Sequence, residues 1–483
     1  MDGIYDKTVE KAISFVRKCK YNRALECIKA ASMLQYHLNT IFTDERLNLL
    51  LREISSEKCN VKENYIPKDD VVFFYDAFGK DNKGLTQQYL DALINLDGKT
   101  KLIYIIENCF CNESKSIRKM LGDSSAIIIE LGSADVLEKV NIIQQLILKY
   151  SPKSCLFHID PARSLAPIIA FYPFKQILKY QINLTDHAFW IGGHDFFNFI
   201  FEFREYGAAI SLKERKFKDN QILYLPFYPW IEKKTFLGFP DIVNGKTIVF
   251  SGGALYKIYD KEDEFLNIAK EIIEIDNNTI FVFAGNGNTT HFFEYVKLHN
   301  LENRFVYIGN RTDISDVMNR IDIYLGTYPL AGGLMTQLAA ISGKPIIAYK
   351  NMGIEDFLNL PEGEHVVYQS KEELLKEAKH LLKCEEYRIE RGQYLKGLVN
   401  NQLKFRSTFS ELYKNHSSLH EISDIYRDYS TFYKSYLHRI NSNEFGGYLE
   451  ALLVKATHIL YSYKVVVNIL LNLGSIIEIK KNN

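Results

Sequence analysis

Short apolar segments alternate with helical patterns twice along this chain, and this alternation limits the folds open to it. The first series runs from residue 70 to residue 229. Continuous apolar runs are typical of parallel strands whose sheet is covered by helices on both faces. The first series therefore predicts an α/β domain with strand candidates at 71–79, 101–107, 125–131, 154–160, 165–171 and 222–229.

A second series follows a segment that contains Gly238, Pro240 and Gly245, which we interpret as a linker. Six apolar segments lie between residues 247 and 368, and helical patterns separate most of them. The sequence thus predicts two Rossmann-like, doubly wound domains facing a cleft, at residues 61–240 and 241–400. In this architecture ligands bind outside the carboxyl ends of the strands.

Both ends of the chain carry helical patterns instead. Residues 1–60 have apolar residues at helical spacing, and segment 20–31 is similar to one helix of a tetratricopeptide unit. Because arrays of this kind need several repeats, we interpret a single unit as a helical cap or a docking element. Residues 401–483 form a C-terminal region that is predicted to be helical to its end.

The C-terminal segment 449–479 has leucines at helical spacing and lysines among or after them. Two interpretations remain open for it. The helix could lie in a membrane interface, with its lysines towards anionic lipid. It could instead be a closing helix that packs on the protein or on a second subunit, which is favoured because residues 465–467 are apolar on too many sides for an interfacial helix.

Composition excludes several classes of function. Lys plus Arg and Asp plus Glu both number 59, so no overall field attracts nucleic acid. The seven cysteines are irregularly spaced, which suits free thiols in a reducing compartment. The N-terminus lacks the apolar core of a secretory signal, and no run of about eighteen apolar residues exists. We therefore expect a cytoplasmic protein, with peripheral contact to the inner face of the membrane as the only membrane association.

The stretch 321–349 carries the most information about function. An apolar strand leads into a turn that holds Pro329, and a helix opens at Gly332-Gly333. A glycine-rich turn that opens a helix presents unpaired backbone N–H groups and the positive end of the helix, which together suit a phosphate group. The alternative is an ordinary strand–turn–helix connection.

Two further loops follow strands of the second domain and are expected to join this turn. Lys257 would stabilise the charge of a diphosphate leaving group, although alone it is more simply a solvated surface lysine. The predicted donor-binding residues of the three loops are Ser251, Gly252, Gly253, Lys257, Gly309, Arg311, Gly332, Gly333 and Thr336.

In the first domain, the segment 183–207 contains two pairs of a histidine and an aspartate around Gly192-Gly193. A transferase that inverts its sugar needs a general base for the acceptor hydroxyl, and His or Asp can serve. Either histidine could instead be a structural residue. The predicted catalytic residues are Asp186, His187, His194 and Asp195, and His158 with Asp160 is the runner-up pair. A second set, on the acceptor side, is Gly84, His158 and Asp160.

The second domain resembles nucleotide-sugar glycosyltransferases of the GT-B fold, and in particular the O-GlcNAc transferase-like family. The resemblance rests on residues 255–258 (LYKI), on Gly326-Thr327, on Gly332 and on residues 343–345 (GKP), with residues 405–416 similar to the helix that closes these domains. It implies that Lys257 binds the donor diphosphate and that the donor is a nucleotide-diphosphate sugar, with a UDP-sugar as the first candidate. No metal and no cofactor are expected, because the helix end and the lysine would stabilise the charge.

The sequence departs from this family at positions that contact the donor. Leu334 and Met335 stand where the family has two threonines, and Leu338 stands where an acidic residue binds the ribose, with Gln337 beside it. These departures leave an inactive, transferase-like partner subunit open as an alternative. The paired glutamates of retaining GT-B enzymes are also missing from this stretch, which favours inversion.

The sequence as a whole predicts a glycosyltransferase that moves a hexosyl or N-acetylhexosaminyl group to a hydroxyl acceptor. The acceptor could be a glycan, a lipid-linked glycan or a protein, and a single tetratricopeptide-like unit is a thin arm for binding protein, so a surface polysaccharide is favoured. The rival functions are the inactive partner subunit and a nucleotide-sugar epimerase of the GT-B fold.

Overall fold

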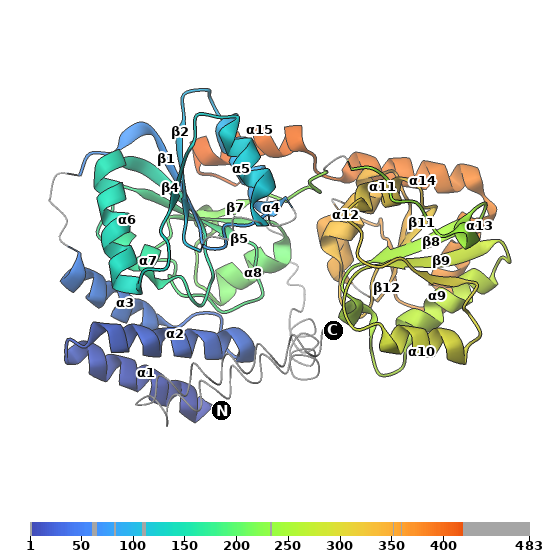
Figure 1. Ribbon diagram of the computed structural model, residues 1–483, viewed down its shortest axis with the longest axis horizontal. Coiled ribbons are helices and arrows are strands. Elements are labelled where there is room, and N and C mark those ends of the chain that lie inside the picture. Colours follow the sequence, from blue (N-terminus) through green and yellow to red (C-terminus); the bar gives the residue numbers. More distant parts are fainter. Residues whose placement is uncertain are drawn as a thin grey trace. The chain divides into compact units, whose positions relative to one another are not determined.

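The computed structural model describes residues 2–59, 65–81, 84–108, 113–231, 234–350, 352–358 and 360–418. The chain divides into two compact units (Figure 1). The first unit contains the described residues up to Pro226 and those from Leu403 onward, and the second is Phe227–Gln402. The predicted helix at 449–479 lies outside the described residues.

The first unit is built around a parallel sheet of seven strands. The strand order β3-β2-β1-β4-β5-β6-β7 reverses direction between β1 and β4. Asp76 lies opposite His158 in the register of β1 and β4, and Asn183 lies opposite Glu202 in β5 and β6. The strands are β1 (Lys68–Asp76), β2 (Lys101–Ile106), β3 (Ile127–Glu130), β4 (Pro152–His158), β5 (Leu178–Asn183), β6 (Phe199–Glu202) and β7 (Ile222–Tyr224).

Helices cover this sheet, as the alternation predicted, but two parts of the prediction were wrong. Residues 165–171, predicted as a strand, form a helix whose every residue is buried, so its apolar run shows no period. Pro167 lies in its first turn, where a missing N–H costs little. Strands β5 and β6 were not predicted, since β5 buries polar residues at alternate positions. The helices are α4 (Leu85–Ile94), α5 (Lys115–Gly122), α6 (Val136–Tyr150), α7 (Leu165–Phe171) and α8 (Glu205–Lys213).

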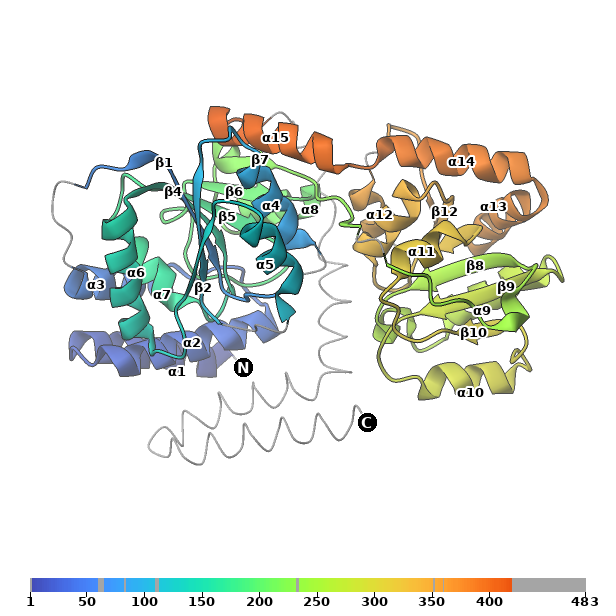
Figure 2. The ribbon, with the colours of Figure 1, turned by 45° about the horizontal axis from the view of Figure 1, so that its top comes forward.

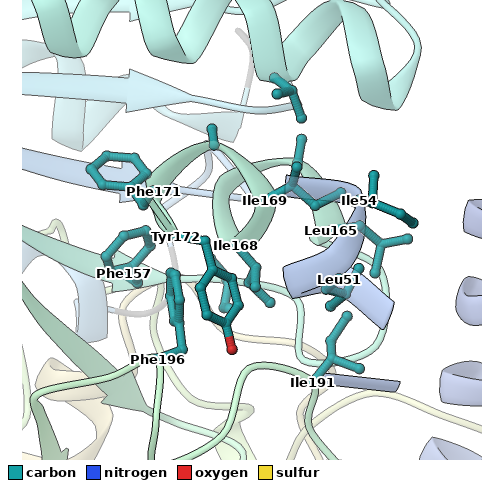
Figure 3. Close-up of a cluster of buried hydrophobic side chains, with 14 of the residues drawn as sticks. Leu51, Ile54, Phe157, Leu165, Ile168, Ile169, Phe171, Tyr172, Ile191 and Phe196 are labelled. Atoms are coloured by element: carbon teal, nitrogen blue, oxygen red, sulfur yellow. The ribbon is translucent and has the colours of Figure 1, made fainter. Parts of the chain in front are cut away.

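The N-terminal extension consists of α1 (Asp2–Arg17), α2 (Tyr21–Leu38) and α3 (Glu45–Lys58). Leu51 and Ile54 of α3 lie beside Leu165 and Ile169 of α7, and the four side chains belong to one buried cluster (Figure 3). Ser55 Oγ donates to the carbonyl of Ile169 at 2.8 Å. The extension is therefore part of the core of the first unit.

The helix α15 (Gln402–Asn415) packs on the first unit beside α4 (Figure 2). Its aromatic residues Phe405 and Phe409 contact the ring of Tyr89. Arg406 donates to both carboxylate oxygens of Asp91 at 2.6 Å, a paired geometry that fixes direction as well as distance. The chain thus returns to the first unit after it has completed the second.

The second unit is also a parallel sheet, in the order β10-β9-β8-β11-β12-β13. Its six strands confirm the second predicted alternation. They are β8 (Thr247–Gly252), β9 (Thr279–Ala284), β10 (Phe305–Tyr307), β11 (Ile323–Leu325), β12 (Ile346–Tyr349) and β13 (Val367–Tyr368). The helices are α9 (Glu264–Glu274), α10 (Thr290–Leu298), α11 (Ile314–Asn319), α12 (Gly333–Ile341), α13 (Lys371–Lys383) and α14 (Glu385–Leu398).

In the part of the chain that the structure describes, no helix is both long enough and apolar enough to cross a membrane.

Candidate functional site

The strand order of the second unit reverses between β8 and β11, and the loops after these two strands meet there. Lys257 lies in a 3-10 helix, Leu255–Ile258, that follows β8. Its Nζ donates to the carbonyl of Ala331 at 3.0 Å, directly before the glycines that open α12. The structure therefore brings the predicted lysine and the predicted helix N-terminus together, at the place where ligands bind in such folds.

The loops after β8, β9 and β10 lie against one another through glycines. Gly253 has φ +141°, a conformation that side chains disfavour, and a side chain at Gly285 would overlap the carbonyl of Gly253. The N–H of Gly285 donates to the carbonyl of Gly309 at 2.9 Å. Gly285 and Gly287 were not among the predicted site residues, although Gly-x-Gly directly after an apolar strand is a signal for such a loop.

Side chains cover two of the glycines that a phosphate was expected to approach. A Cβ at Gly252 would lie 2.9 Å from the terminal carbon of Met335, and one at Gly333 would overlap the ring of Phe357. Thr336 is fully buried, and its Oγ1 lies 3.3 Å from the carbonyl of Gly332, as expected for a helical threonine. The missing side chain at Gly333 thus accommodates Phe357.

Arg311 contacts the segment that precedes β8 within the second unit. Its guanidinium pairs with both carboxylate oxygens of Asp313 at 2.6 and 2.7 Å and donates to the carbonyl of Gly238 at 2.8 Å. The hydrogen bond from Arg311 lowers the pKa of Asp313 to about 2. Asp313 also accepts from the N–H of Leu237 at 2.8 Å. This placement gives Arg311 a structural task in holding residues 237–238.

Three further residues near the turn before α12 are buried. Leu338 belongs to the apolar core of the second unit. Gln337 donates from its amide to the carbonyl of Phe227 at 2.8 Å. Ser251 is fully buried in β8, and its hydroxyl has no hydrogen-bond partner among the described residues.

In the first unit, the strand order reverses between β1 and β4, and an aspartate and a histidine end these strands. His158 Nδ1 lies 3.0 Å from Asp76 Oδ1 and 3.3 Å from Thr86 Oγ1. Burial alone would raise the pKa of Asp76, but His158, the Tyr104 hydroxyl and the N–H of Phe78 hold it below its usual value. The pair is buried, with Asp76 0 % and His158 3 % exposed.

His158 was predicted to pair with Asp160, and the structure pairs it with Asp76 instead. Asp160 accepts from the N–H groups of Ala162 and Arg163, both at 3.0 Å, and so closes the turn before α7. Gly84, with φ +88°, precedes α4, the helix that carries Thr86.

Asp186 and His187 follow the end of β5, at the carboxyl edge of the sheet, where the strands end. His187 Nδ1 lies 3.3 Å from Asp186 Oδ1, and the imidazole side chain is 24 % exposed. Arg204 pairs with the same carboxylate at 2.5 and 3.0 Å. Although burial alone would raise the pKa of Asp186, the charge of Arg204 and the hydrogen bonds from His187 and Arg204 lower it. The pair has the arrangement of an imidazole oriented by a fixed carboxylate.

His194 and Asp195 lie at the opposite edge of the same sheet, because they precede β6. The backbone N–H of Asn198 donates to the carbonyl of Lys179, near the start of β5. Asp195 accepts from Arg52 of α3 and from the hydroxyl of Tyr172 at 2.7 Å. These contacts favour a structural role for His194 and Asp195, because Asp195 connects α3 with the loop that precedes β6.

Glu202 lies near Asp186, since a side chain at Gly207 would meet both carboxylates. Its ionisation can be used to test how strongly this region is buried. Burial raises its pKa from 4.5 to about 8 against the opposing charge of Arg215. The folded protein therefore holds a proton that the unfolded chain releases between these values, so stability is expected to fall as pH rises from about 4.5 to about 8. Glu202→Gln should remove most of this pH dependence. The expected difference in the free energy of unfolding across the range is several kcal/mol, because each tenfold change in proton affinity corresponds to about 1.4 kcal/mol.

Urea unfolding at pH values across this range measures the effect. The lowered pKa of Asp186 makes stability fall as the pH decreases, and this occurs at lower pH than the effect of Glu202. The difference in stability between parent and variant therefore reports Glu202. The control is Glu214→Gln, because Glu214 is exposed at the end of α8, the helix that follows β6. This variant should keep the parental dependence of stability on pH. Parallel slopes for parent and Glu202→Gln would contradict the assignment.

A cavity of about 610 Å³ in the second unit is lined by none of these residues. It is lined by Glu355, His365, Val367, Tyr368, Gln369, Glu373, Lys376, Glu377 and His380. Among the described residues, no group of three His, Cys, Asp or Glu side chains is arranged to hold a metal ion.

Most of the second unit matches one protein family. Residues 245–384 match the family model described as Glycosyl transferases group 1. No curated protein sequence matches the chain.

Several solved structures are similar to the larger part of the chain. A lysine-to-methionine variant of the O-GlcNAc transferase of Thermobaculum terrenum aligns with a TM-score of 0.51 at 11 % identity, over 86 % of this chain and 82 % of that one. HepE of Anabaena, in complex with UDP, aligns with a TM-score of 0.53 at 11 % identity, over 71 % and 99 %. The lipopolysaccharide outer core galactosyltransferase WaaB has a TM-score of 0.50 at 13 % identity, over 71 % and 99 %. At such identities the likeness shows the fold, which is GT-B.

Proposed function

Because the chain has a GT-B fold and its second domain resembles nucleotide-sugar glycosyltransferases, we propose that it transfers a sugar from a nucleotide-diphosphate sugar to a hydroxyl acceptor. The observation that carries the proposal is the hydrogen bond from Lys257 to the carbonyl of Ala331, at the strand-order reversal and at the N-terminus of α12. A lysine and a helix N-terminus at one point are suited to the charge of a departing diphosphate.

In the proposed reaction, an acceptor hydroxyl attacks the anomeric carbon while the bond from that carbon to the phosphate oxygen breaks. The electron pair leaves with the nucleotide diphosphate, where Lys257 and the N–H groups of α12 stabilise it. The acceptor proton passes to a base of the first unit. We assign this role to His187, since it lies at the carboxyl edge and its carboxylate partner is itself held by Arg204. A base of this kind supports transfer with inversion.

The donor is proposed to be a UDP-sugar, hexosyl or N-acetylhexosaminyl, which agrees with the UDP in the structure of Anabaena HepE. A surface polysaccharide is the preferred acceptor. The five described cysteines, Cys19, Cys27, Cys59, Cys155 and Cys384, are free thiols, which supports a location in the cytoplasm.

Purified protein given a panel of nucleotide-diphosphate sugars is expected to release free nucleotide diphosphate from one of them without any acceptor, with water taking the place of the hydroxyl. Chromatography of the nucleotides measures the release, and proton NMR of the freed sugar shows the anomeric configuration at early times. An inverted configuration supports the proposed mechanism. Isomerisation of the donor sugar without release indicates an epimerase.

A partner subunit without activity is the second candidate, and one observation favours it. Met335 and Phe357 cover Gly252 and Gly333, two of the glycines expected to face the phosphates. This candidate predicts that no nucleotide diphosphate is released from any donor of the panel.

A further inference from the structure

The loop that carries His187 is fixed through three consecutive backbone carbonyls. Arg215 Nη2 donates to the carbonyl of Asp186 at 2.7 Å and to that of Ala188 at 2.6 Å. Between them, Asn39 Nδ2 donates to the carbonyl of His187 at 2.6 Å. Asn39 ends α2, so one of the three hydrogen bonds comes from the N-terminal helices.

Both donors are held in place by their own surroundings. Arg215 is 1 % exposed, and its guanidinium lies over the ring of Trp190, 3.9 Å from the centroid, with Phe42 at 5.6 Å. Asn39 has a left-handed backbone, φ +49°, and its N–H donates to the carbonyl of Gln35 at 2.6 Å. The carbonyl of Phe42 accepts from the N–H of Trp190 at 3.1 Å. The connection between α2 and α3 therefore makes two hydrogen bonds to the loop 186–190, one at His187 and one at Trp190.

We infer that Asn39 is a positioning residue for His187, and that the N-terminal helices thereby complete the acceptor side of the site. The inference rests on the proposed role of His187 as the base. The imidazole reaches Asp186 over 3.3 Å, near the limit of a hydrogen bond, so a small shift of the backbone breaks the contact. Misplacement of a reacting group by about 1 Å can cost about a hundredfold in rate.

Two variants of Asn39 test this role. Asn39→Gly keeps the left-handed backbone available and removes the donor, and Asn39→Asp keeps the shape and removes the donor. Both are expected to lower kcat by about tenfold or more while KM for the donor sugar changes less than about twofold, since the donor residues lie in the second unit. Asn300→Gly is the matched control, because Asn300 is also left-handed, with φ +54°, and lies in the second unit. It should keep the parental kcat.

A second measurement does not depend on turnover. In protein labelled at histidine, the imidazole resonances of His187, assigned with His187→Ala, should be sharp in the parent and broadened or shifted in both Asn39 variants. Unchanged resonances, or a parental kcat in both variants, would overturn the inference. If the parent releases no nucleotide diphosphate, the proposed function fails instead, and the resonances still decide whether Asn39 holds His187. A normal kcat for His187→Ala would remove the role of His187 as base and with it the inference.

Discussion

Lys257→Ala is expected to lower kcat/KM for the donor sugar by at least about 100-fold, or about 2.7 kcal/mol, while the protein stays folded. The ammonium of Lys257 lies 3.0 Å from the carbonyl of Ala331, at the opening of α12. A diphosphate bound there would gain most from this charge as the glycosyl bond breaks, so the loss should appear in kcat as well as in KM. Steady-state release of nucleotide diphosphate measures both constants.

Lys261→Ala is the matched control, because Lys261 is exposed and lies four residues further along the chain. It should retain the parental constants, which shows that charge alone near the loop is not sufficient. Thermal unfolding of both variants confirms that the fold is intact. A Lys257→Ala protein with parental turnover at saturating and at low donor concentration would mean that the diphosphate binds elsewhere.

Leu51→Ala is expected to destabilise the first unit by about 2–5 kcal/mol, the usual cost of removing a fully buried leucine side chain. Leu51 has no exposed surface, and it packs with Ile54 against α7 (Figure 3). If the N-terminal helices were a separate docking arm, the same change would leave the α/β sheet unaffected. Urea unfolding measures the effect, with both proteins carrying Trp230→Phe so that the fluorescence reports Trp190 in the first unit.

Leu49→Ala on the same helix is the control for Leu51→Ala. Leu49 is 48 % exposed, so its truncation should change the free energy of unfolding by less than about 0.5 kcal/mol. Equal unfolding midpoints for the two variants would contradict the packing of α3 into the core of the first unit.

The local patterns of the second unit were sufficient for prediction because each of its strands is a short apolar run followed by a turn. The strand ending at Gly252 and the helix opening at Gly333 were both predicted, and the parallel order then places their loops together. In the first unit the same method mistook α7 for a strand, because a helix buried on every side shows no period. It missed β5, whose buried polar residues Lys179, Gln181 and Asn183 resemble an exposed segment.

The sequence by itself determined the two α/β domains, the glycine turns and the candidate lysine, since these depend on residues close together in the chain. The tertiary structure alone decided which groups meet. Asp76 and His158 are neighbours because β1 and β4 pair, and they are 82 residues apart in sequence. The pairs at 186–187 and 194–195 look alike in sequence, yet they lie at opposite edges of one sheet, because β5 ends before the first pair and β6 begins after the second. A chain pattern carries residue types and spacing, whereas the edge on which a side chain lies depends on strand direction.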